Sequence, residues 1–263
     1  MEYIGIRGHR GAGKKSVSYL LGNTISSILN NDMDDFDKNY NNWVNDMMEY
    51  EFSIYRCNLN KVYFDSFSDT LKLFIQLLIG VPNNYLYEDY YKDHIVVNIK
   101  DFSYKEYQEL PTDIKILTKD ELYEIMVDLQ NPIALTKNLY ITLRDLILYF
   151  GIDVMQRFFG LNVWVKCLKN SASQFESIFT EDDYYKIFID VKTPSEVTYI
   201  LDNGGVIIDI KRKNNKKKSK GFDKLSKDGR IDYTIYVDGG LYDLKDQILE
   251  IANDIVNRNK KHD

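Results

Sequence analysis

The chain has few of the features that mark several classes of protein. It holds only two cysteines, Cys57 and Cys167, in 263 residues. That number does not suggest a disulfide scaffold, and no Cys/His cluster has metal-ligand spacing. No apolar run approaches the roughly 20 residues that a membrane-spanning helix needs. The N-terminus begins with a strand-like run and lacks the pattern of a signal peptide. We therefore expect a cytoplasmic protein in a reducing setting, with no membrane partner.

An excess of positive charge is also missing. The formal net charge is −6, which argues against a general nucleic-acid coat protein, although a local basic patch can still bind phosphates. The length and the 44% hydrophobic content suit one large α/β domain or two small ones. Small molecules are thus expected as partners, and nucleic acid is not.

Apolar patterns predict alternating strands and helices. Tyr3 to Ile6 reads as a buried strand, and an amphipathic helix begins at Ser16. Residues 187–210 read as a β-α-β unit, with a capping box from Thr193 to Glu196, and the two strands of such a unit are parallel. Further strands are expected at 62–64 and 233–237, and further helices at 71–78, 119–129, 139–150, about 153–169 and 241–255, whereas the tyrosine-rich residues 83–120 show no clear pattern. These patterns predict an α/β fold.

The segment Gly8-His9-Arg10-Gly11-Ala12-Gly13-Lys14-Lys15-Ser16 lies between the first strand and the first helix. In such a loop, successive main-chain N–H groups form a nest for an anion, and the helix that follows points its positive end at the same anion. Gly11, Gly13, Lys14 and Lys15 are expected to cradle the phosphates of ATP, with Lys14 adding its charge. Ser16 is expected near Mg²⁺, and Arg10 over the transferring phosphate.

Several later segments, taken in order, resemble the phage and viral deoxynucleoside monophosphate kinase family. Besides the loop, which fits G-x-x-G-x-G-K-x-[ST], the matching segments are Phe67 to Lys72, Arg144, Gly151-Ile152-Asp153, Trp164-Val165, Ile189 to Lys192 with Glu196, Gly204 to Arg212, and Asp232 to Leu244. No single one of these later motifs is specific, and their collinearity over most of the chain carries the resemblance.

The resemblance implies a single P-loop kinase domain over 1–263 that transfers the γ-phosphoryl group of ATP to a deoxynucleoside monophosphate (dNMP). Its fold would be a P-loop NTPase-type parallel sheet flanked by helices, with helical acceptor-binding and lid insertions. Residues 1–30 and 185–263 would form the nucleotide-binding core, and about 31–180 the acceptor and lid region. The family also implies Mg²⁺ and a homodimer.

Further site residues are expected on this basis. Asp190 ends a buried strand and is expected to hold Mg²⁺ through water, although a cap of the next helix is the alternative. Arg212 is expected over the adenine by analogy with the family. The acceptor and its phosphate are assigned to five residues that can also be read as a helix cap, solvated helix faces or a core aromatic: Asp69, Lys72, Arg144, Arg157 and Trp164.

Three departures from the family pattern keep other functions open. Lys192 stands where the family usually has arginine, which would replace a bidentate phosphate contact by a single-point one. Lys15 stands where many members of the family have an acidic residue. The short segment with a histidine and a final glutamate that the family has after its basic strand end is not recognisable between Gly221 and Arg230. The basic run Lys211 to Lys220 fits a lid, a solvated loop or a nucleic-acid patch. The alternatives are another P-loop kinase, acting on a small molecule or a nucleic-acid end, and a non-catalytic nucleotide-binding regulator.

Overall fold

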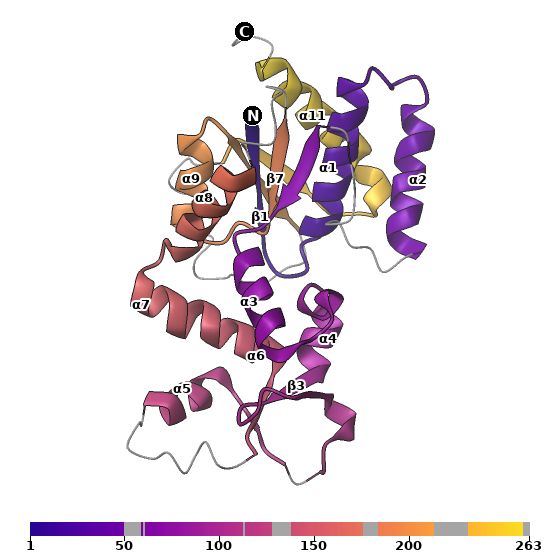
Figure 1. Ribbon diagram of the computed structural model, residues 1–263. Helices are drawn as coiled ribbons and strands as arrows, with labels where there is room; N and C mark the ends of the chain where they lie inside the picture. The colour runs from indigo at the N-terminus through magenta and orange to yellow at the C-terminus, as the bar shows by residue number, and fades with distance from the viewer. Residues whose placement is uncertain are drawn as a thin grey trace. The chain divides into compact units, whose positions relative to one another are not determined.

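The computed structural model describes residues 1–49, 59, 61–112, 114–127, 138–175, 184–212 and 231–259. The chain divides into two compact units (Figure 1). Unit 1 comprises Met1–Phe67 and Gln174–Asp263, and unit 2 comprises Ser68–Ser173. Unit 1 is thus made from both ends of the chain, and unit 2 is inserted between them.

Unit 1 is built on a sheet whose five strands, among the described residues, all run parallel in the order β2-β7-β1-β8-β9. The strands are β1 (Glu2–Gly8), β2 (Val62–Asp65), β7 (Tyr185–Ile189), β8 (Val206–Lys211) and β9 (Tyr233–Tyr236). The predicted α/β fold with a parallel sheet is confirmed. The two strands of the predicted β-α-β unit are β7 and β8, and β1 lies between them.

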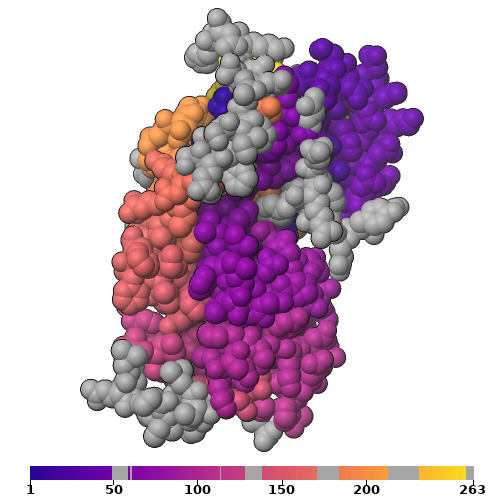
Figure 2. Space-filling view, in the orientation of Figure 1, coloured from indigo at the N-terminus to yellow at the C-terminus, as the bar shows by residue number. Residues whose placement is uncertain are grey.

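Helices cover both faces of this sheet (Figure 1). The helices of unit 1 are α1 (Lys14–Leu29), α2 (Phe36–Glu49), α9 (Pro194–Asp202), the short 3₁₀ helix η7 (Leu241–Leu244) and α11 (Lys245–Asn259). Figure 1 shows α1 and α11 on one face and α9 on the other. Figure 2 shows α2, in violet, on the outside of unit 1. Tyr40 of α2 is buried, and its hydroxyl donates to the carbonyl of Leu241 at 2.9 Å.

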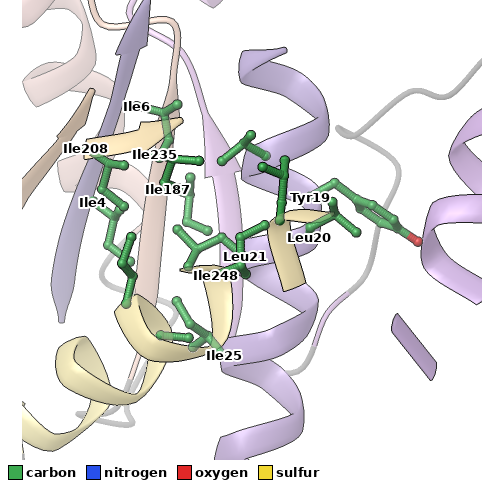
Figure 3. Packing of buried hydrophobic residues seen from close by; sticks show 14 of the residues in the cluster. Ile4, Ile6, Tyr19, Leu20, Leu21, Ile25, Ile187, Ile208, Ile235 and Ile248 are labelled. Atoms are coloured by element: carbon green, nitrogen blue, oxygen red, sulfur yellow. The ribbon is translucent and has the colours of Figure 1, made fainter. Parts of the chain in front are cut away.

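The core of unit 1 follows from the alternation of side chains along its strands. Figure 3 shows strand isoleucines packed against α1 and α11, and the labelled residues are Ile4, Ile6, Tyr19, Leu20, Leu21, Ile25, Ile187, Ile208, Ile235 and Ile248. On the opposite face, a Cβ added to Gly5 would lie 2.6 Å from the Cδ1 atom of Ile200 on α9. Glycine at this position therefore lets α9 approach the sheet closely.

Unit 2 contains a second, smaller sheet in the order β4-β3-β6-β5. Its strands are β3 (Ile95–Asn98), β4 (Tyr104–Glu106), β5 (Ile116–Leu117) and β6 (Tyr140–Thr142). The β3–β4 and β3–β6 pairs are antiparallel, and the β5–β6 pair is parallel. The helical segments of this part of the chain are α3 (Asp69–Ile79), η2 (Asn83–Leu86), α4 (Asp89–His94), η3 (Tyr107–Glu109), α5 (Lys119–Val127), α6 (Leu143–Leu148), the π-helix η5 (Tyr149–Gln156), α7 (Arg157–Phe159) and α8 (Val163–Phe175).

Two helix predictions in unit 2 were wrong in detail. The first residues of the helix predicted over 139–150 form β6, and α6 starts only after Thr142, whose hydroxyl accepts the N–H of Asp145. The helix predicted over about 153–169 is interrupted at Gly160, which has a φ of 90°. A left-handed glycine of this kind commonly ends a helix, so α8 begins anew at Val163.

No single helix of the described residues is both long and apolar enough to cross a membrane. One bent pair in the same residues, Leu143–Phe159 with Val163–Asn170 at 90°, meets that test by length and composition alone.

Candidate functional site

The glycine-rich loop connects the carboxyl end of β1 to the first turn of α1. Gly11 and Gly13 have φ values of 77° and 93°, in the left-handed region that glycine enters at little cost. The N–H of Ala12 donates to the carbonyl of His9 at 3.1 Å and closes the turn. Such a turn, followed directly by a helix N-terminus, directs main-chain N–H groups at one point and can hold an anion there.

The ammonium group of Lys14 lies within the curve of this loop. Its Nζ donates to the carbonyl oxygens of Gly8 and His9, each at 2.9 Å. The same atom lies 3.2 Å from Oδ1 of Asp190, and the Lys14 side chain is only 13% exposed. A largely buried cation is therefore held at the position where the loop can receive an anion.

Asp190 follows the last residue of β7, the strand that pairs with β1. Its Oδ1 faces Lys14, and its Oδ2 lies 2.6 Å from Nζ of Lys192. Burial alone would raise the pKa of Asp190, but the ammonium groups of Lys192 and Lys14 outweigh it and hold that pKa below its ordinary value. The carboxylate thus stays ionised beside the loop. Two strands far apart in sequence bring these groups together at the carboxyl edge of the sheet, where α/β proteins bind ligands.

The residue that follows β8 adds a cationic side chain beside the loop. A Cβ added to Gly13 would lie 3.9 Å from Nη2 of Arg212, so this predicted residue does lie beside the loop. Arg10 is exposed in the loop, and Lys15 is partly buried in the first turn of α1. The predicted lid residues from 213 to 220, and the segment 221–230, lie outside the described residues.

Ser16 and Asp190 offer the donors for a magnesium ion. In the described ranges no group of three or more His, Cys, Asp or Glu side chains could hold a metal. Mg²⁺ commonly takes only one or two protein oxygen ligands and completes its shell with water and phosphate. Ser16, in the first turn of α1, supplies a hydroxyl and Asp190 a carboxylate. This donor set fits an ion that is brought in with a phosphate.

In unit 2, Asp69 and Lys72 lie close together in the first turns of α3. Nζ of Lys72 is 3.1 Å from Oδ1 of Asp69 and 4.0 Å from the ring centroid of Tyr87. The Tyr87 hydroxyl donates to the same oxygen of Asp69 at 3.2 Å. Tyr87 was missed by the sequence analysis because it belongs to the segment without a clear pattern, 18 residues further along the chain.

The other predicted acceptor residues have partners within unit 2. Arg144 pairs with the carboxylates of Asp89 and Asp93 on α4. The guanidinium of Arg157 lies 4.5 Å from the ring centroid of Tyr123. Trp164 is 7% exposed, and its indole N–H donates to the carbonyl of Gly151 at 3.3 Å. Roles for these residues in acceptor binding stay predictions, and in this arrangement each of them also stabilises unit 2.

Comparison of the sequence with protein-family models and with curated proteins finds no match. The resemblance to deoxynucleoside monophosphate kinases therefore stays a prediction. The geometry around Lys14 is independent of that resemblance, because it depends only on the contacts just described.

Proposed function

We propose that unit 1 binds ATP with Mg²⁺ at the loop from Gly8 to Ser16, and that the protein transfers the γ-phosphoryl group to a deoxynucleoside monophosphate. One observation carries the proposal. The buried ammonium of Lys14 lies inside a glycine-rich loop and 3.2 Å from the carboxylate of Asp190, at the end of the neighbouring parallel strand. A lysine, a main-chain nest and an acidic residue are the parts with which P-loop proteins hold a triphosphate and its metal.

The topology supports a P-loop NTPase-type core. The loop follows the central strand β1, and β7, the strand that Asp190 follows, is the direct neighbour of β1. The connection through α9 passes over one face of the sheet and α1 lies on the other (Figure 1). The connections that follow the neighbouring strands β1 and β7 thus run over opposite faces of the sheet, and ligands of open α/β sheets bind at such a switch point.

The residues of the site suit phosphoryl transfer, which depends mainly on positioning and on positive charge around the moving group. Lys14 exchanges the carbonyl oxygens of Gly8 and His9 for phosphate oxygens of the donor. Asp190 and Ser16 hold Mg²⁺, which supplies charge neutralisation at the phosphates when bound. Arg10 and Lys192 flank the site and add positive charge where the γ-phosphoryl group leaves the donor.

The choice of acceptor rests on the resemblance. It assigns the acceptor phosphate to Lys72, Arg144 and Arg157, and the base to Trp164. It also carries our proposal of a homodimer, whereas the proposal of a cytoplasmic location comes from the low number of cysteines. The observed cluster of Asp69, Lys72 and Tyr87 is compatible with a role in binding a phosphate, because it combines a mostly buried ammonium with groups that fix its position.

A panel of monophosphates tests the proposal. ADP release from ATP is followed in a coupled assay with deoxyribo and ribo forms of each nucleoside monophosphate. We expect at least one deoxy form to stimulate ADP release, and Lys14→Met to abolish that stimulation. Lys38→Met, which removes an exposed lysine of α2, is the matched control and should retain activity. A wild-type protein whose ATP turnover responds to no monophosphate would rule out this function.

A further inference from the structure

The turn that follows β7 contains a backbone conformation that needs support. Asp190 has a φ of 76°, in the left-handed region that residues with a Cβ rarely occupy. Such conformations persist where the surrounding structure holds them, and they cluster at functional sites. The question is therefore which groups keep Asp190 in this conformation.

Four successive N–H groups of this turn are bound at two points. The N–H groups of Asp190 and Val191 both donate to the carbonyl of Ile6 on β1, at 3.1 and 2.8 Å. Those of Lys192 and Thr193 both donate to a single oxygen, Oε2 of Glu196, at 2.6 and 2.9 Å. One fixed point is thus the main chain of the central strand, and the other is a side chain.

Glu196 has two structural tasks that can be separated. It forms the predicted capping box with Thr193, whose hydroxyl accepts the N–H of Glu196 at 3.3 Å. Its bond to the N–H of Lys192 is additional, since a capping box joins only the N-cap residue and the third helical residue. The Glu196 residue is 5% exposed, and burial raises the pKa of its carboxyl. Because the Glu196 side chain is buried and accepts two main-chain N–H groups, its position is well defined.

The proposal follows from the path of contacts. The N–H of Lys192 is held by Glu196, the ammonium of Lys192 contacts Oδ2 of Asp190, and Oδ1 of Asp190 faces Lys14. We infer that Glu196 is a positioning residue of the phosphate site, which holds Lys192 and, through it, the Asp190 carboxylate in the orientation that faces Lys14. The inference rests on the proposed function for the identity of the ligand, whereas the contacts themselves belong to the ligand-free protein.

Three variants separate this role from that of an ordinary helix cap. Glu196→Gln keeps an oxygen that can accept both N–H groups. Glu196→Ala removes both bonds. Thr193→Ala removes the hydroxyl of the cap but leaves the N–H groups of Lys192 and Thr193 bound to Glu196. Thermal unfolding of each variant measures the cost of the lost cap, which Glu196→Ala and Thr193→Ala share.

Two measurements give the expected results. In calorimetric titration with ATP and Mg²⁺, Glu196→Ala should weaken binding about tenfold, the loss expected for one hydrogen bond, because only the bond to the N–H of Lys192 lies outside the helix cap. Glu196→Gln and Thr193→Ala should stay within about twofold of the wild-type affinity, which is under 0.5 kcal/mol. In the ligand-free protein, the ¹³C chemical shift of the Asp190 carboxyl at constant pH reports the contacts of that group.

A change in that chemical shift has two possible sources. Glu196→Ala and Glu196→Gln both remove the charge of Glu196, but only Glu196→Ala removes the acceptor of the Lys192 N–H. We therefore expect the chemical shift of the Asp190 carboxyl to change more in Glu196→Ala than in Glu196→Gln or Thr193→Ala.

The possible results separate a positioning role of Glu196 from that of a helix cap alone. A chemical shift of the Asp190 carboxyl that Glu196→Ala changes no more than Glu196→Gln does overturns the inference whether or not nucleotide binds. Equal weakening of ATP binding by Thr193→Ala and Glu196→Ala also overturns it, because the cap alone would then explain the effect. If wild-type protein binds no ATP while the chemical shift of Asp190 changes as expected, the proposed function fails and the positioning role of Glu196 stands.

Discussion

The buried ion pair beneath the loop provides a quantitative test of the structure. Arg7 and Asp209 are register partners on β1 and β8, with Nε of Arg7 3.3 Å from Oδ1 of Asp209. Their side chains are 1% and 7% exposed. Burial lowers the pKa of Arg7 and raises that of Asp209, while their mutual attraction opposes both changes.

This environment determines the effect of removing one or both partners. Arg7→Met leaves the Asp209 carboxylate buried, with Lys211 still 3.8 Å away, and should cost about 3–5 kcal/mol of unfolding free energy. The double variant Arg7→Met/Asp209→Leu removes both charges together. It should be about as stable as the wild type, or more stable by up to roughly 4 kcal/mol, because neither ion must then be desolvated.

Urea unfolding followed by tryptophan fluorescence measures these free energies. Trp43 packs against the core of unit 1, whereas Trp164 belongs to unit 2. The variants are therefore made in a Trp164→Phe background, so that the signal reports unit 1. A loss below about 1 kcal/mol in Arg7→Met would contradict a buried pair. A double variant as unstable as Arg7→Met would show that the guanidinium has a packing role that methionine cannot replace.

Three further predictions concern the loop and its neighbour. Lys14→Met should raise the dissociation constant of ATP at least tenfold in calorimetric titration, since charge-assisted hydrogen bonds contribute about 1.5–3 kcal/mol each. An unchanged dissociation constant would exclude Lys14 from the site. Gly13→Ala should lower the unfolding free energy by about 1–2 kcal/mol, because a residue with a Cβ is strained at the left-handed φ of this position. The new Cβ adds no clash, since the nearest atom outside its chain neighbours is 3.9 Å away. Equal stability to wild type in urea would contradict the observed φ. Asp190→Asn should be less stable than the wild type at neutral pH. The difference should begin to shrink as pH falls below about 4 and should disappear below the lower pKa that Asp190 has in the folded state, because a carboxyl with a lowered folded-state pKa loses its stabilising effect as pH falls through that pKa. A difference independent of pH would argue against the ion pairs of Asp190.

The parts of unit 1 that were predicted correctly have strong local signals. The buried strand before Gly8, the helix after it and the capping box at Thr193 each follow from neighbouring residues. The parallel arrangement followed from the β-α-β unit, since such crossovers leave little choice of direction. Asp190 was expected at the ligand-binding edge of the sheet because it follows a buried strand, whereas its contact with Lys14 is known only from the structure.

Unit 2 was harder to predict because its elements are short. The strands of its sheet have two to four residues, too few for a clear period-two pattern. Tyr140–Thr142 therefore looked like the start of the apolar helix that follows it. Contacts between distant residues, such as Arg7 with Asp209 or Lys72 with Tyr87, depend on the fold and leave no pattern in a single sequence.

The most direct test of the proposed phosphoryl transfer follows the phosphoryl group itself. ATP labelled with ³²P in the γ-position is incubated with the protein, Mg²⁺ and a dNMP, and the products are separated. We expect the label in the deoxynucleoside diphosphate, and we expect the Lys14→Met variant to transfer none. Label found only in ATP, or released only as inorganic phosphate, would contradict it.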